Sequence, residues 1–164
     1  MQIRLCGLDD LDRVEDILIH AKADMNARGL DFWDNIYPTR ETYRHDIADK
    51  SLYGAFEGEL LGVFTLNAEQ EPEYSSLLWK YDGPVLVVHR LCIHPEHAGK
   101  GMATSLMQYA EQYAAENGYN AIRLDSYCDN ERANRMYHRL GYEKAGYVTF
   151  RKGSFACFEK HIGK

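Results

Sequence analysis

Residues 85 to 103 read V-L-V-V-H-R-L-C-I-H-P-E-H-A-G-K-G-M-A, and this stretch decides the fold. An apolar run of strand length ends at His94-Pro95, and a glycine-rich loop then opens a helix. The first amides of a helix have no partner within the helix, and the helix dipole places partial positive charge there. Gly99 and Gly101 let the backbone approach a bulky anion without a Cβ in the way. The stretch therefore predicts a buried strand followed by a phosphate-binding loop.

The sequence on both sides alternates between strand and helix patterns. Before the stretch we expect a strand at 3–5, helices at 10–25 and 39–48, and hairpin strands at 53–56 and 60–66. Residues 67–84 are expected to form a variable loop with some strand near Leu77. After the stretch we expect helices at 101–116 and 131–140, a strand at 121–126, and closing strands near 142–148 and 155–160. With no repeat or linker, this order predicts one α/β domain over residues 1–164.

Composition limits the classes of function. The chain has 164 residues, of which 45% are hydrophobic and 27% charged, and it holds no apolar run of membrane-spanning length. Its start, M-Q-I-R-L-C-G-L-D-D, is no signal peptide, so a cytoplasmic location is expected. The net charge of -6 argues against nucleic acid and is compatible with a cationic amine. The four cysteines are widely spaced without a C-x-x-C pair, which predicts free thiols and no metal site.

Three interpretations of the glycine loop are open on local grounds. A Walker-type loop is disfavoured because Lys100 lies between the two glycines and no glycine precedes it at the required spacing. A dinucleotide loop is disfavoured because Thr104 occupies the position of the third glycine. The remaining alternative to phosphate binding is that the glycines only shape the start of a helix.

Two motifs in this order resemble those of the GNAT superfamily of acyl-CoA N-acyltransferases. The first is a long strand ending near V-H-P, followed by [Q/R]-x-x-G-x-[G/A]; here Ile93-His94-Pro95 is followed by Gly101 and Ala103. The second, N-x-x-A-x-x-x-Y-x-x-x-G-[F/Y], is filled at every position, by Asn130, Ala133, Tyr137, Gly141 and Tyr142. The resemblance implies an α+β or α/β sandwich with a mixed, mostly antiparallel central sheet flanked by helices.

The resemblance also implies acetyl-CoA as the cofactor and a set of residues that bind it. Main chain at the end of the strand would pair with the pantetheine arm, which points to Leu91, Cys92 and Ile93. The pyrophosphate would lie on the loop and first helical turn, formed by Ala98, Gly99, Lys100, Gly101, Met102, Ala103 and Thr104. Asn130 and Asn134 would bind the pantetheine amides. Ala98 departs from the family's Gln or Arg, and His97 or Lys100 is expected to compensate.

Tyr137 and His89 are the candidate catalytic residues. Tyr137 matches the family tyrosine near the sulfur and is the candidate general acid, although its helical spacing also suits a packed core aromatic. His89 lies on an otherwise apolar strand and is a candidate base, since imidazole titrates near neutrality. The alternative is a histidine bonded to a neighbouring strand. A covalent route through Cys92 is disfavoured.

Trp33 and Tyr37, with Phe32, lie in the segment expected to border the acceptor site, although such a cluster is equally typical of a core. The resemblance implies an N-acetyltransferase that moves an acetyl group to a primary amine, of a small molecule or a peptide, by direct transfer in a ternary complex. A catalytically weak or inactive CoA-binding module of the same fold is the alternative. Dimerisation is common in the family, so a homodimer is compatible with it, although the sequence shows no clear interface.

Overall fold

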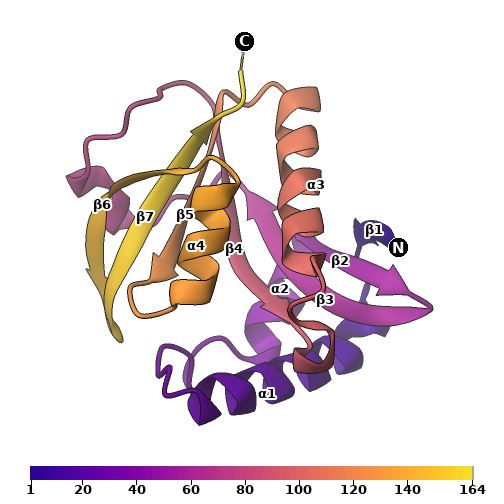
Figure 1. The fold of residues 1–164 in the computed structure, drawn as a ribbon. Coiled ribbons are helices and arrows are strands. Elements are labelled where there is room, and N and C mark those ends of the chain that lie inside the picture. Colours follow the sequence, from indigo (N-terminus) through magenta and orange to yellow (C-terminus); the bar gives the residue numbers. More distant parts are fainter. Residues whose placement is uncertain (164) are drawn as a thin grey trace. The chain divides into compact units, whose positions relative to one another are not determined.

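The computed structural model describes residues 1–163, and the chain falls into two compact units (Figure 1). The first unit comprises Met1–Leu66 and Arg90–Tyr109, and the second comprises Asn67–His89 and Ala110–Lys164. The unit boundaries fall inside three elements, the strands β3 (Glu59–Asn67) and β4 (Val85–Ile93) and the helix α3 (Met102–Glu116). Each unit therefore consists of two separate lengths of chain.

The first unit contains an antiparallel ladder and two helices. Its strands are β1 (Gln2–Leu5), β2 (Leu52–Glu57) and β3 (Glu59–Asn67), and β2 pairs antiparallel with both others. A 3-10 helix, η1 (Leu8–Asp10), leads into α1 (Leu11–Ala27), and α2 (Arg40–Ala48) follows. The core of this unit takes side chains from both helices and from the strands: Cys6, Leu11, Val14, Ile17, Leu18, Ala21, Tyr43, Ile47, Leu52, Leu60, Val63 and Cys92.

Local sequence explains the start of α2. The amide of Thr42 donates to Thr39 Oγ1 at 3.4 Å, and the amide of Thr39 donates to Thr42 Oγ1 at 3.0 Å. This reciprocal cap provides partners for two amides that the helix itself leaves unbonded. The aromatic segment that ends at Pro38 is therefore followed at once by a firmly capped helix.

The second unit contains the first residues of β4, up to His89, and three whole strands. These three are β5 (Ala121–Tyr127), β6 (Glu143–Phe150) and β7 (Gly153–His161), with α4 (Glu131–Arg139) between β5 and β6 in sequence. β7 pairs antiparallel with both β5 and β6. Its core includes Tyr74, Val85, Val87, Ala121, Val148 and Cys157.

The strand order of the sheet is β1-β2-β3-β4-β5-β7-β6, which confirms the predicted mixed, mostly antiparallel sheet. Among the strand pairs that the structure describes, β4 with β5 is the parallel one. That ladder joins Val85–Val87 to Ala121–Arg123, and β4 continues beyond it to Ile93. The last residues of β4 therefore lie outside the ladder with β5.

The prediction of some strand near Leu77 is wrong. Residues Pro72–Ser76 form a 3-10 helix, η2, and the amide of Leu77 donates to the carbonyl of Tyr74 at 3.2 Å as the helix ends. The Trp79 indole also donates to the Tyr74 carbonyl, at 2.8 Å. The segment is therefore stabilised as a loop by bonds within it, from the Leu77 amide and the Trp79 indole to the same carbonyl. Across residues 1–163, none of the helices combines the length and apolar character that a membrane crossing requires.

Candidate active site

The predicted phosphate loop connects a 3-10 helix, η3 (Pro95–His97), to α3. Gly99 and Gly101 have φ values of 77° and 80°, in the left-handed region that favours glycine. A Cβ placed at either glycine would meet no atom within 4 Å. The backbone conformation therefore requires both glycines, and the space beside them is open.

The amides that follow the loop are those a helix leaves without internal partners. The first bond into α3 is donated by the amide of Ser105 to the carbonyl of Gly101, at 3.0 Å. The amides of Met102, Ala103 and Thr104 precede this bond, so they are available to an anion at the helix N-terminus. The amide of Ala98 differs, because it donates to the carbonyl of Pro95 at 3.2 Å.

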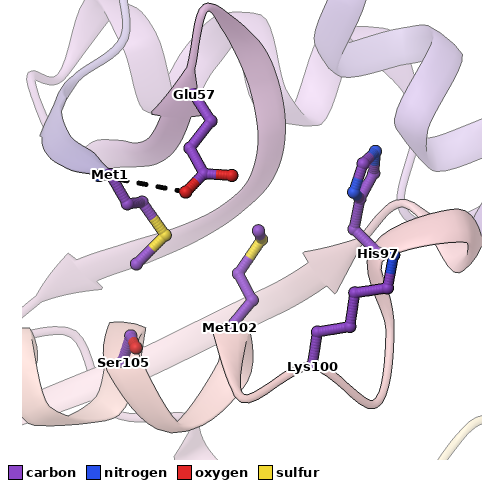
Figure 2. Close-up of a pocket in the computed structure, with 6 residues that line it drawn as sticks. All are labelled: Met1, Glu57, His97, Lys100, Met102 and Ser105. Atoms are coloured by element: carbon purple, nitrogen blue, oxygen red, sulfur yellow. Dashed lines mark ion pairs between the residues drawn. The ribbon is translucent and has the colours of Figure 1, made fainter.

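A small pocket in the first unit borders this loop. Its lining residues are Met1, Glu57, His97, Lys100, Met102 and Ser105. Figure 2 shows the side chain of Lys100 extending from the loop toward His97, so two basic groups lie on one side of the loop. On the other side, the N-terminal ammonium lies 3.9 Å from Glu57 Oε1. The positive charge in this pocket is therefore concentrated at the loop.

The end of β4 carries the residues predicted to face the pantetheine arm. Leu91 and Ile93 are half-buried, whereas Cys92 is 2% exposed. Burial raises the pKa of the Cys92 thiol to about 12, and a hydrogen bond with Tyr43 lowers it only in part. The thiol stays protonated at neutral pH, and the thiolate is the nucleophilic form. This disfavours a covalent route through Cys92.

A strained residue that the sequence analysis missed lies directly before this strand end. Arg90 has φ of 52° within β4, a conformation uncommon outside glycine. Its Nε and Nη2 donate to Asp46 Oδ2 and Oδ1 at 2.9 and 2.8 Å, and Tyr43 donates to its carbonyl at 3.1 Å. Thr65 donates to Asp46 as well, at 2.8 Å. The sequence feature that could have pointed to Arg90 is a charged residue inside an otherwise apolar strand.

The predicted acceptor residues differ in their surroundings. Lys22 donates to the carbonyls of Asp34 and Pro38, which holds the intervening segment against α1. Trp33 packs against the core cluster of the first unit, as the alternative interpretation expects. Tyr37 is 40% exposed, and its hydroxyl accepts a hydrogen bond from Arg90 Nη1 at 2.9 Å. Tyr37 is therefore the more accessible of the two.

The two asparagines of the second unit have different bonds. Asn130 caps α4, and its Oδ1 accepts from the amide of Ala133 at 3.4 Å. Asn134 Nδ2 donates to the carbonyls of Tyr127 and Cys128, at 3.3 and 3.1 Å. These two bonds fix the orientation of the amide, and its Oδ1 is buried with no partner among residues 1–163. A buried acceptor without a donor costs free energy, so this atom is suited to an incoming N–H group.

Tyr137 packs among aromatic rings of the second unit. Its ring lies 5.7 Å from that of Phe158 and 6.1 Å from that of Tyr142, measured between centroids. Burial, and after it the charge of Asp125, raises the pKa of Tyr137 well above the ordinary value for tyrosine. The hydroxyl is therefore protonated at neutral pH and can act as a hydrogen-bond donor.

His89 bonds to the last residue of β3. Its Nε2 lies 2.7 Å from Asn67 Oδ1, and the same oxygen accepts from the amide of Glu69 at 3.0 Å. Because Oδ1 is thereby fixed as an acceptor, Nε2 carries the proton and Nδ1 carries the lone pair. The bond to a neighbouring strand is present, and the basic nitrogen of the ring is Nδ1.

Asp125 on β5 is a second residue that the sequence analysis missed. The Tyr74 hydroxyl donates to Asp125 Oδ2 at 2.6 Å. Burial is the main cause that raises the pKa of the Asp125 carboxyl from 3.8 to about 6; Glu71 and Glu73 add to the increase and the Tyr74 bond opposes it. Such perturbed groups are concentrated at functional sites. Nothing around this aspartate in sequence signals its partner, which is 51 residues away.

A separate cluster in the first unit has the residue types of a metal site. One ligand atom from each of Asp16, His20 and His94 lies within 4.8 Å of the others. Arg13 donates to Asp16 Oδ2 at 2.8 Å, and the amide of Glu96 donates to His94 Nδ1 at 3.2 Å. A bound cation would compete with the guanidinium and with this amide, so the donor set is already in use by the protein.

The predicted site residues thus fall into two groups. The first unit brings together the glycine loop, the end of β4 and the segment with Trp33 and Tyr37. The second unit holds His89, Asn130, Asn134 and Tyr137. One group offers main-chain donors and basic side chains, and the other offers amide and hydroxyl groups with a histidine.

The chain belongs to the acetyltransferase (GNAT) family, whose sequence profile matches residues 17–142. The uncharacterized N-acetyltransferase YesJ of Bacillus subtilis (strain 168) is 26% identical over 160 residues, which cover 94% of this chain and 86% of YesJ. A streptothricin acetyltransferase of Escherichia coli is 28% identical over 120 residues, covering 71% of this chain and 62% of that protein.

Solved structures share the fold. A GNAT-family acetyltransferase from Streptococcus agalactiae 2603 has a TM-score of 0.88 at 24% identity, covering 99% of this chain and 96% of its own. YncA of Salmonella typhimurium, a protein solved with acetyl-CoA, has a TM-score of 0.72 at 17% identity, covering 98% and 93%. The PaiA N-acetyltransferase of Thermoplasma acidophilum, solved with coenzyme A, has a TM-score of 0.73 at 18% identity, covering 98% of both chains.

Proposed function

We propose that this acetyltransferase moves an acetyl group from acetyl-CoA to a primary amine by direct transfer in a ternary complex. The observation that carries the proposal is the loop at Gly99 and Gly101, whose open glycines lead into the unbonded amides at the start of α3. Family membership and the ligands of YncA and PaiA support the same cofactor. The absence of an apolar spanning helix among residues 1–163 is compatible with work in the cytoplasm.

The residues present fit acetyl-CoA. The amides from Gly99 to Thr104 would bind the pyrophosphate, and Lys100 with His97 would supply the positive charge that Ala98 lacks. Main chain of Leu91–Ile93, outside the ladder with β5, would bind the pantetheine arm. The unpaired Asn134 Oδ1 would accept from a pantetheine amide, with Asn130 next to it at the start of α4. When bound, the cofactor supplies the acetyl group as a thioester.

Two side chains would handle protons. Tyr137 is protonated at neutral pH, so its hydroxyl can donate a hydrogen bond to the departing sulfur and stabilise the charge that develops there. His89, which bonds to Asn67 through Nε2, would take the proton from the substrate ammonium and leave a neutral amine to attack the thioester. The raised pKa of Cys92 favours direct transfer over an acyl-cysteine. Tyr37 and Trp33 would border the acceptor, which is an amine of a small molecule or a peptide.

A thermal melt with acetyl-CoA, ATP and NAD as separate additions tests the cofactor. Binding at about 100 times the dissociation constant adds about 2.7 kcal/mol of stability, a shift of several degrees for a chain of this size. We expect the shift with acetyl-CoA only, and a larger shift with ATP or NAD would overturn the proposal. Release of free thiol in the presence of a primary amine then distinguishes a working transferase from an inactive CoA-binding module.

A further inference from the structure

Among residues 1–163, Asp46 and Glu159 are the buried acidic residues and Asp125 is half-buried, and these three carboxylates have unequal partners. Asp46 is paired with Arg90 at 2.8 Å, and Glu159 lies 3.9 Å from Arg123 Nε. Asp125 has no lysine, arginine or histidine within ion-pair distance among residues 1–163. Buried carboxylates are ordinarily paired with a cation, because removal from water penalises the charge. Asp125 is the exception.

The groups that bond to Asp125 or shift its pKa supply no positive charge. Arg123, two residues earlier on the same face of β5, lies 3.9 Å from Glu159 instead. The hydroxyl of Tyr74, from η2, is its hydrogen-bond partner, and Glu71 and Glu73 act on it from the same loop. Tyr137 of α4 and Cys157 of β7 are near enough for their ionisation to be opposed by the Asp125 charge. Apart from Arg123, every one of these groups is neutral or negative at neutral pH. The surroundings therefore favour the arrival of a cation from outside.

We propose that Asp125 is the residue that binds the acceptor, and that it takes a primary alkylamine in the protonated, ammonium form. This inference rests on the proposed function and names the charge state of its substrate. An alkylamine has a pKa near that of lysine, about 10.4, so it is an ammonium ion at neutral pH. The ammonium would serve as the cationic partner that Asp125 lacks within residues 1–163, and the negative charges of Glu71 and Glu73 would add to the attraction.

The position of Asp125 suits this role. It lies in the second unit with Tyr137, the residue proposed to act on the sulfur, and its charge helps to raise the pKa of the Tyr137 hydroxyl. Its carboxylate is held by a hydroxyl from Tyr74, which is 1% exposed and anchored in the core of that unit. A carboxylate fixed in this way presents a defined direction to an ammonium group. Asp125 is thereby assigned to specificity and positioning, and the proton transfer itself stays with the candidate base.

The test is a comparison of Asp125→Asn with Glu116→Gln, which removes the same charge from an exposed position at the end of α3. A panel of primary alkylamines is assayed with the wild-type enzyme, and the amine turned over fastest is used for all variants. Asp125→Asn is expected to raise the KM for this amine about 10-fold or more, since a charge-assisted contact is lost. The KM for acetyl-CoA and the increase in melting temperature that acetyl-CoA produces are expected to stay the same. Glu116→Gln is expected to change none of these.

A pH profile separates recognition from a merely structural role. In the wild type, kcat/KM for the amine is expected to decline below about pH 6, where the Asp125 carboxyl takes up a proton. That decline should disappear in Asp125→Asn and persist in Glu116→Gln. Tyr74→Phe, which removes the donor but no charge, should move the decline to higher pH, because the hydroxyl favours the ionised carboxylate.

The outcomes distinguish this inference from the proposed function. Normal turnover with an unchanged amine KM in Asp125→Asn would overturn the inference alone. A parallel increase in the KM for acetyl-CoA would also overturn it, since the residue would then act on the fold of the site. No turnover with any amine, or no stabilisation by acetyl-CoA, would overturn the proposed function and the inference with it.

Discussion

Asp46 in the first unit is buried and Asp125 in the second is half-buried, and the two carboxylates differ in their partners. Asp46 accepts two bonds from Arg90 and one from Thr65. Asp125 accepts one bond, from a neutral hydroxyl. An ion pair that is fully satisfied within the protein stabilises a framework, whereas a withdrawn charge without a partner is a cost that the fold carries. The comparison separates a carboxylate that positions backbone from one that is available to a ligand.

The largest loss of stability is expected from a substitution at Asp46. Asp46→Asn leaves the Arg90 guanidinium, whose side chain is 13% exposed, without its counter-charge. We expect a loss of about 3–5 kcal/mol in the free energy of unfolding, measured by urea titration. Asp49→Asn is the control, because Asp49 lies just past the same helix and half-exposed. A loss at Asp46 no greater than that at Asp49 would contradict the framework role.

A substitution at Asp125 is expected to increase the free energy of unfolding, whereas the substitution at Asp46 decreases it. Its pKa is raised to about 6 in the folded protein from 3.8, so the folded state binds the proton more tightly than the unfolded chain does. The contribution of this group to stability is greatest below about pH 4 and is lost as pH rises to about 6. Asp125→Asn should therefore stabilise the protein at pH 8, by at most about 3 kcal/mol, with the gain vanishing toward pH 4. Urea titrations across this pH range measure it, and a destabilised variant at pH 8 would count against the comparison.

A smaller effect on stability tests whether the backbone conformation of residue 90 matters apart from its charge. Two double variants are compared: Arg90→Gly combined with Asp46→Asn, and Arg90→Ala combined with Asp46→Asn. Both remove the guanidinium and the carboxylate charge together, and they differ only in the Cβ at position 90. Glycine adopts the φ of 52° freely and alanine does not, so the glycine variant should be more stable by about 1 kcal/mol. The same pair should differ in acetyl-CoA affinity if residue 90 sets the path of Leu91–Ile93. Equal stability in the two variants would mean that the left-handed conformation is lost along with the ion pair.

The features of the fold and of the site that could be predicted from the sequence depend on residues close together in the chain. Gly99 and Gly101, the apolar run before them and the stripe of Val14, Ile17 and Leu18 each carry their structural meaning within a few residues. The capping role of Asn130 is of the same kind, since its partner is three residues away. These features follow from helix periodicity and from the conformational freedom of glycine.

What could not be predicted depends on pairing across the chain. Arg90 and Asp46 are 44 residues apart, and Tyr74 and Asp125 are 51 apart. No periodicity or motif connects such positions, because their contact is created by the fold itself. The mistaken strand near Leu77 has the same origin: Trp79 and Tyr74 bond within the loop, and that bond outweighs a local strand propensity.

The interleaving of the two units has a consequence for the chain as it leaves the ribosome. The first unit cannot close until Tyr109 has been synthesised, and the second receives Val85–His89 long before the strand that will pair with it. The whole of α3 is made between β4 and its parallel partner β5. During that interval the apolar run of Val85–Val88 belongs to a strand that has β3 as a neighbour on one edge but lacks β5 on the other, and exposed strand edges of this type are where nascent chains aggregate. The parallel crossover that characterises the mature sheet is thus also the step of biosynthesis most in need of a chaperone or of rapid elongation.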